Sequence, residues 1–131
     1  MIVVDASVLT DALTDDGEVG DTNRAALQRD PHWAAPAHLV LEVASAIRGG
    51  LLGGKIMLER AADAVDVLGR LEIDPVDPVV LLPRIWQLRS NLTVYDAAYV
   101  AAAEALGCPL LTGDVRLARA SGLSCRVQVV A

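Results

Sequence analysis

The chain has 131 residues, a length that predicts a single domain over residues 1–131 with enough material to bury a core. Hydrophobic residues make up 53% of the sequence, yet charged residues interrupt every long apolar run, so the composition excludes a membrane span. The net charge of −6 argues against a general polyanion-binding protein, although metal ions bound to carboxylates can reverse the field of an acidic site.

The first predicted element is a short buried strand at residues 2–4, where three β-branched side chains follow one another. Asp5 stands at the carboxyl end of this strand, the edge at which open α/β sheets place their ligands. Ser7 is the expected N-cap of a helix over residues 7–14. Asp5 alone is equally compatible with a turn or capping acid. No basic region precedes the strand, so a signal peptide is not predicted and we expect a cytoplasmic protein.

Apolar periodicity and chain breakers predict the elements in the middle of the chain. We expect strands at 33–35 and 71–74, and helices over 18–29, 36–48, 55–70 and 78–88. The helix over 36–48 is apolar on nearly all sides and should be well buried. After it, the glycine pairs at 49–50 and 53–54 predict a loose connection.

The last third of the chain also alternates helices with strands. An alanine-rich helix is predicted over 95–106, and it ends at Gly107, the residue type that commonly stops helices. A buried strand at 109–112, a short helix up to residue 120 and a final strand at 126–130 complete the chain. This alternation predicts an α/β fold, in which helices cover both faces of a mainly parallel sheet.

Glu42 is the most informative acidic residue, because apolar residues surround it in the predicted helix over 36–48. A carboxylate in a buried helix is unfavourable unless a cation, a metal ion or a water-filled cleft accommodates its charge. Alternatively, Glu42 lies on a solvent-facing stripe with His38, Ser45 and Gly49, which stand at helical spacing. The first interpretation makes Glu42 a candidate for chemistry, and the second makes it an ordinary surface acid.

Two further acids stand where the chain enters a helix. Asp96 lies in the first turn of the helix over 95–106, where the helix dipole alone favours an acid, but the alanines of this helix also allow a neighbouring element to approach closely. Asp114 repeats the arrangement of Asp5, because a buried strand ends at Thr112 and the acid follows. If the two strands are neighbours, their carboxylates lie within roughly 5–10 Å of each other.

The candidate metal site is a cluster of four carboxylates without histidine or cysteine, namely Asp5, Glu42, Asp96 and Asp114. Carboxylates this close repel each other, and a hard divalent cation such as Mg²⁺ or Mn²⁺ resolves the repulsion. Such a site suits the hydrolysis of phosphodiester bonds. The two strand-end acids are the expected direct ligands, and the two helix acids complete the shell or orient the attacking water. Supporting hydroxyl groups are expected from Ser7 and Thr112.

The stretches that carry these acids are residues 2–9, 41–43, 92–101 and 110–114. In this order they resemble the PIN domain, and specifically the VapC-type toxin ribonucleases of type II (VapBC) toxin–antitoxin systems. The resemblance extends over nearly the whole chain. Its most specific part is the helix start Tyr95-Asp96-Ala97 followed by the turn Thr112-Gly113-Asp114.

This resemblance implies a small three-layer α/β/α sandwich and a Mg²⁺- or Mn²⁺-dependent endoribonuclease that acts as a toxin. It also implies an RNA substrate, a cognate VapB-type antitoxin and a homodimer. The acidic residues of the family correspond here to Asp5, Glu42, Asp96 and Asp114. Some relatives carry another acid two residues after the last one, where this chain has Arg116, so a fifth ligand is missing. Arg116 is either a contact to RNA phosphate or a solvated surface residue.

Two other functions compete with this interpretation. One is a non-catalytic interaction module whose acids bind an arginine of a partner protein. The other is a phosphatase of the haloacid dehalogenase type, which also begins with a strand that ends in aspartate. That class carries a second aspartate two residues later, where this chain has Ser7, and the difference argues against it.

Overall fold

The computed structural model describes residues 1–130 and is built on one sheet of five strands. All neighbouring strands are parallel, and their order across the sheet is β3-β2-β1-β4-β5. The strands are β1 (Ile2–Val4), β2 (Trp33–Pro36), β3 (Ile73–Val76), β4 (Leu110–Thr112) and β5 (Val127–Val129). The predicted α/β class with a parallel sheet is therefore confirmed.

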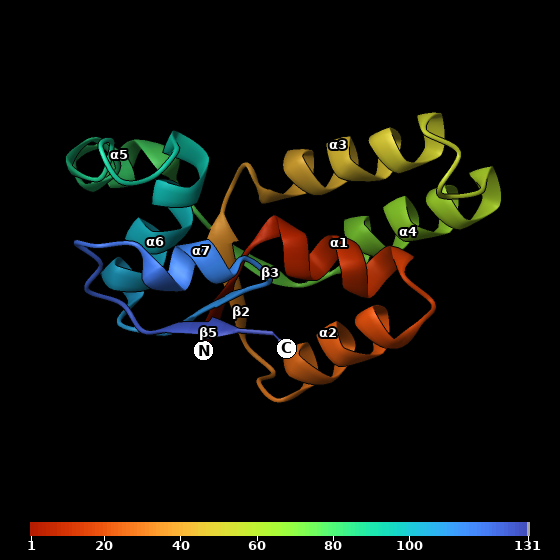
Figure 1. Ribbon diagram of the computed structural model, residues 1–131, viewed down its shortest axis with the longest axis horizontal. Coiled ribbons are helices and arrows are strands. Elements are labelled where there is room, and N and C mark those ends of the chain that lie inside the picture. Colours follow the sequence, from red (N-terminus) through yellow and green to blue (C-terminus); the bar gives the residue numbers. More distant parts are fainter. Residues whose placement is uncertain (131) are drawn as a thin grey trace.

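Helices cover the sheet from two sides (Figure 1). One side carries α1 (Ala6–Thr14), α2 (Glu18–Gln28), α3 (Leu39–Leu52) and α4 (Leu58–Arg70). The other side carries α5 (Pro78–Gln87), α6 (Val94–Leu106) and α7 (Val115–Arg119). Right-handed crossovers explain this division, because the chain moves across the sheet toward β3 in its first half and toward β5 in its second half. The three layers form the expected α/β/α sandwich.

The direction of the chain across the sheet reverses between β1 and β4, which are neighbours. Val4 is paired with Leu111, so the two strands end side by side. In open α/β sheets the crevice at such a reversal, outside the carboxyl ends of the strands, is the place where ligands bind. The proximity predicted for Asp5 and Asp114 requires β1 and β4 to be neighbours, and the strand order shows that they are.

The most buried helix is α6, which packs on β1 and β2. Every residue from Ala97 to Ala103 is buried, and five of these seven residues are alanine. The small side chains let the helix axis lie close to the sheet, where larger residues would force it away. The helix ends at Gly107, whose φ of 63° lies in the left-handed region that favours glycine.

The start of α1 differs from the prediction. The helix begins at Ala6, and Asp5 rather than Ser7 is its N-cap, because the Asp5 carboxylate accepts a hydrogen bond from the Val8 amide at 3.2 Å. Ser7 lies inside the first turn. Either residue type caps helices well, so the sequence alone does not decide between them. Asp5 consequently combines the capping role with its place at the strand end.

The bounds of α3 also differ from the prediction. The helix begins at Leu39, since Pro36 belongs to β2, and it continues through Gly49 and Gly50, where a loop is predicted. The Ile56 side chain packs closely on Gly50, since a Cβ atom there would lie 2.5 Å from the end of that side chain and would require it to shift. Close packing of the following turn on the helix therefore overrides the low helix propensity of glycine.

The predicted all-round burial of α3 is wrong. Only one face is buried, at Leu39, Val43 and Ile47, while Leu41 is 72% exposed. The reason is that α3 contacts other helices, α1 and α4, without a second layer above it. Smaller corrections apply to the next elements, since α4 begins at residue 58 and β3 covers 73–76. Among residues 1–130, no helix is both long and apolar enough to cross a lipid bilayer.

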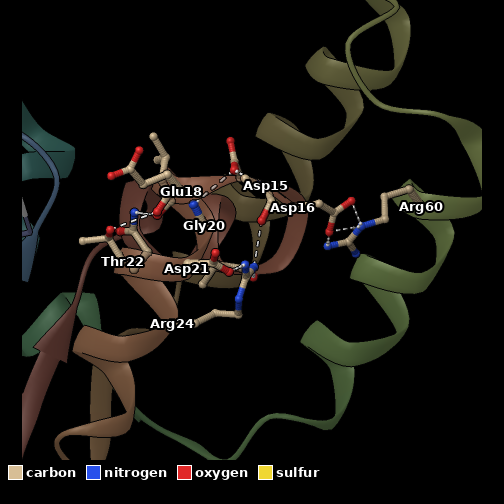
Figure 2. A network of polar contacts seen from close by, with 12 residues as sticks. Asp15, Asp16, Glu18, Gly20, Asp21, Thr22, Arg24 and Arg60 are labelled. Atoms are coloured by element: carbon tan, nitrogen blue, oxygen red, sulfur yellow. Dashed lines mark hydrogen bonds and ion pairs between the residues drawn. The ribbon is translucent and has the colours of Figure 1, made fainter.

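A polar network joins the helices at the end of α1 that lies away from Asp5 (Figure 2). Arg24 on α2 donates hydrogen bonds to the carbonyl oxygens of Ala12 and Asp15, each at 2.8 Å. Arg60 on α4 forms an ion pair with Asp16 at 2.9 Å. These contacts satisfy carbonyl groups at the end of α1 and connect the α1–α2 turn to α4.

Candidate active site

Asp5 is the most enclosed of the four candidate acids, with an exposure of 6%. Its carboxylate accepts hydrogen bonds from Ser7 Oγ at 2.6 Å, from the Val8 amide at 3.2 Å and from Thr112 Oγ1. Burial raises the pKa of the Asp5 carboxyl, while these hydrogen bonds oppose the rise and the charge of Asp96 adds to it. Asp5 is therefore fixed in a desolvated position, where its negative charge is unfavourable without a nearby cation.

Two hydroxyl groups connect the ends of β1 and β4. Thr112 Oγ1 donates to Asp5 and accepts a hydrogen bond from the Asp114 amide at 3.0 Å. Ser7 Oγ donates to Asp5 and accepts a hydrogen bond from the Gly113 amide at 3.1 Å. Both hydroxyls thus contact the acid that they are predicted to support, and both also hold the turn that follows β4.

Glu42 lies in the first turn of α3, and its side chain is 33% exposed. The Tyr99 hydroxyl on α6 donates a hydrogen bond to Glu42 Oε1 at 3.2 Å, and His38 Nε2 lies 2.7 Å from the same oxygen. Burial raises the pKa of Tyr99, and the charges of Glu42 and Asp5 raise it further, so the phenol stays protonated as a donor. Glu42 is neither the deeply buried charge nor the free surface acid that the sequence suggests.

Asp96 and Asp114 line one hollow of about 320 Å³, at the start of α6 and α7. Thr93 caps α6 by accepting a hydrogen bond from the Asp96 amide at 3.2 Å. Asp114 caps α7, and the Arg116 guanidinium lies 3.3 Å from its carboxylate. The hydrogen bond from the Arg116 side chain lowers the pKa of the Asp114 carboxyl. Arg119 lines the same hollow, so two guanidinium groups accompany two carboxylates there.

Residues 1–130 contain no group of three or more His, Cys, Asp or Glu side chains placed to hold a metal ion. Of the predicted cluster, the structure links Asp5 to Asp114 through Thr112, whereas Glu42 contacts residues of its own turn and of α6. The donors are nevertheless all oxygen atoms, and Mg²⁺ typically takes one or two carboxylates and keeps several water molecules. The residues present fit a hydrated divalent ion better than a fully enclosed one.

Two contributors to this region, His38 and Tyr99, are not among the site residues predicted from the sequence. His38 is interpretable from the sequence only as a structural or surface residue, and Tyr99 only as part of a family motif. The available signal is helical spacing. His38 precedes Glu42 by four residues and Tyr99 follows Asp96 by three, so each aromatic ring shares a helix face with a candidate acid.

Comparisons with known proteins show the family of this chain. Residues 2–123 match the family described as PIN domain. The chain belongs to the PIN-domain family. It is 45% identical to Ribonuclease VapC1 of Mycobacterium tuberculosis over 131 residues, which cover 98% of this chain and 96% of that protein. It is 37% identical to Ribonuclease VapC12 of the same species, and that alignment covers both proteins completely.

A solved structure shows the same fold at low sequence identity. The crystal structure of VapBC2 from Rickettsia felis, bound to a DNA fragment from the promoter of the pair, matches with a TM-score of 0.69 and 16% identity. The match covers 98% of each chain. The family match and the relatives of 45% and 37% identity confirm the resemblance to VapC-type PIN domains. Membership of the PIN family also excludes the alternative of a haloacid dehalogenase-type phosphatase.

Proposed function

We propose that this PIN-domain chain is the toxin of a toxin–antitoxin pair, a Mg²⁺- or Mn²⁺-dependent endoribonuclease that hydrolyses RNA phosphodiester bonds in the cytoplasm. The observation that carries the proposal is the buried Asp5 carboxylate, which two hydroxyls hold where β1 and β4 end. Such a charge favours a bound cation. The relatives that match this chain over nearly their full length are ribonucleases, which supports RNA as the substrate.

Asp5 and Asp114 would provide the direct carboxylate ligands of the cation. Asp114 can do so once Arg116 leaves its carboxylate, and this rearrangement is easy because the Arg116 side chain is 91% exposed. Glu42 and Asp96 would hold water molecules around the ion. When bound, the cation neutralises charge that develops on the phosphate and makes water a better nucleophile.

The chain's own residues divide the remaining work. Ser7 and Thr112 keep the Asp5 carboxylate in one orientation, since each donates a hydrogen bond to it. Arg116 and Arg119 stand beside the acids and are the proposed contacts to RNA phosphate groups. Guanidinium groups beside the acids matter because a net charge of −6 gives the chain as a whole no electrostatic attraction for RNA.

The proposed partners are a VapB-type antitoxin and a second copy of this chain. The solved VapBC2 pair from Rickettsia felis, whose fold this chain shares, supports an antitoxin. The contact between Arg116 and Asp114 illustrates how a guanidinium group from an antitoxin could pair with these acids. A homodimer remains an expectation from the family, and exposed apolar residues on α5 such as Val79, Val80 and Trp86 offer a surface for it.

The test is cleavage of a defined RNA by the purified chain. We expect cleavage that requires added Mn²⁺ or Mg²⁺, stops when a chelator is added, and is roughly 10²- to 10³-fold slower in Asp5→Asn. Cleavage by Asp5→Asn at the wild-type rate would contradict the proposal. Calorimetry with Mn²⁺ alone separates the enzyme from a non-catalytic interaction module, because a module that binds only a partner's arginine shows no binding even at millimolar metal.

A further inference from the structure

We propose that Tyr99 is a positioning residue for Glu42, and that its hydroxyl fixes the carboxylate in the orientation needed for RNA cleavage. This inference rests on the proposed ribonuclease function. The two residues lie on different helical layers, Glu42 on α3 and Tyr99 on α6, and 57 positions separate them in the sequence. Their hydrogen bond of 3.2 Å therefore joins the two layers beside the candidate site.

The donor in this hydrogen bond is rigid. Tyr99 is among the largest fully buried side chains, and it stands within the buried stretch of α6 that packs on β1 and β2. A tyrosine ring has only two rotatable bonds, and burial in a packed core removes their freedom. The position of its hydroxyl is consequently set by the core of the protein.

The acceptor is flexible by comparison. Glu42 has three side-chain torsions and is partly exposed, so without a partner its carboxylate would sample several positions. The Tyr99 hydroxyl and His38 Nε2 both approach Oε1, which leaves Oε2 for water or a cation. In metal sites, residues outside the coordination sphere orient the ligands by hydrogen bonds, and Tyr99 stands in this relation to Glu42.

The surrounding contacts distinguish Tyr99 from Tyr95, the other tyrosine beside His38. The His38 ring packs against both Tyr95 and Tyr99, with centroid distances of 5.5 and 5.1 Å. Only Tyr99 of these two aromatic residues donates to Glu42, while Tyr95 is exposed. Tyr99 also follows Asp96 by one helical turn, so a single helix carries one candidate acid and the group that orients another.

Replacing Tyr99 by phenylalanine tests the proposal, because the ring is kept and only the hydroxyl is lost. We expect Tyr99→Phe to lower kcat roughly 10-fold, to leave KM for RNA within about 2-fold, and to weaken Mn²⁺ binding by calorimetry roughly 10-fold. Tyr95→Phe is the matched control, since it changes the other tyrosine beside His38, and it should behave as wild type. Equal behaviour of the two variants would overturn the proposal.

A double variant separates positioning from a general packing effect. If Tyr99 acts through Glu42, then adding Tyr99→Phe to Glu42→Ala causes no further loss of kcat, because no carboxylate remains to be oriented. If the hydroxyl only stabilises the core, the two losses multiply, and the proposal is wrong. Thermal unfolding of all variants verifies that each one is folded.

The same measurements distinguish a failure of the positioning role from a failure of the proposed ribonuclease function. A wild-type chain that neither cleaves RNA nor binds Mn²⁺ would overturn both. A wild-type chain that does both, with a Tyr99→Phe variant indistinguishable from Tyr95→Phe, would overturn the positioning role and leave the ribonuclease in place.

Discussion

Asp5 and Asp114 each follow a buried strand, β1 and β4, and each precede a helix, yet their surroundings differ. Asp5 is buried and accepts three hydrogen bonds, and burial raises its pKa. The Asp114 side chain is 31% exposed, and the contact with Arg116 lowers its pKa. Both acids cap a helix, so capping alone does not distinguish them.

The difference indicates two separate roles at one edge of the sheet. Asp5 is preorganised, because the fold places it in a desolvated position before any ligand arrives. Asp114 is adaptable, because its partner is an exposed guanidinium that can leave without disturbing the core. In the proposed metal site, Asp5 would be the fixed ligand, and Asp114 would exchange the Arg116 guanidinium for the bound metal ion.

The largest effect is expected from Asp5→Asn. Loss of the fixed negative charge should lower the rate of RNA cleavage roughly 10²- to 10³-fold, because the metal-dependent stabilisation of the reaction is removed. A steady-state assay with a defined RNA measures this. Asp11→Asn is a suitable control, since it removes an acid from the middle of α1 that has no assigned role. Equal rates for the two variants would remove Asp5 from the site.

A smaller loss is expected from Thr112→Val, which keeps the shape of the side chain and removes the hydroxyl that contacts both acids. Activity should fall about 10-fold. The free energy of unfolding, measured in urea, should fall by about 1–3 kcal/mol, because buried polar groups lose a hydrogen-bond partner. Thr112→Ser restores the hydroxyl and should recover most of both properties. If the serine variant is as impaired as the valine variant, the hydroxyl is not the relevant group.

The two acids should affect the pH dependence of stability with opposite sign. Because the pKa of Asp5 is raised, the folded state binds a proton at Asp5 more readily than the unfolded state does. The free energy of unfolding that this proton binding contributes is lost as pH rises above the ordinary pKa of 3.8. A lowered pKa means that the contribution of Asp114 is present above 3.8 and is lost as pH falls below it.

Near neutral pH and without metal, Asp5→Asn should therefore raise Tm by a few degrees, and Asp114→Asn should lower it by roughly 1 °C or less. Both differences should shrink once the pH falls below the lowered pKa of Asp114. Thermal scans of the metal-free proteins over a pH series measure this. Shifts of the same sign at neutral pH would show that the two strand ends are not electrostatically distinct.

The smallest effect is expected from Arg116→Ala. Its loss should weaken RNA binding only a few-fold and reduce the slope of the salt dependence by about one, because one phosphate contact disappears. The same variant frees Asp114, so Mn²⁺ should bind slightly more tightly. Arg70→Ala, on the exposed end of α4, is the control. An unchanged salt slope would assign Arg116 to the solvated surface.

The sequence predicts most strands and helices because their signals are local. Short apolar runs, such as those before Asp5 and Asp114, mark the strands, and apolar periodicity marks the helices. It also places Asp96 correctly in the first turn of its helix. It does not predict the extent of α3, because Gly49 and Gly50 have low helix propensity, and the packing of Ile56 on Gly50 arises only in the folded chain. Nor does it predict that Leu41 is exposed, since this depends on which layers lie above the helix.

The surroundings of the acids are the least predictable part. The contact between Asp5 and Thr112 spans 107 positions, and the contact between Glu42 and Tyr99 spans 57. Both arise from the order of strands and the angles between helices, which periodicity does not encode. Local patterns therefore find the acids, and tertiary structure decides which of them is fixed, paired or partly exposed.

The hydrogen bond between Thr112 and Asp5 also has a consequence for the time at which activity arises. A ribosome releases β1 before β4, so a growing chain contains Asp5 well before Thr112, whose hydroxyl lies 107 positions later and completes the surroundings of Asp5. The core helix α6, which supports the same edge, also emerges late. If the proposed site needs both Asp5 and Thr112, a nascent chain that does not yet contain Thr112 lacks a complete site. We expect a product truncated before residue 112 to be inactive for the same reason.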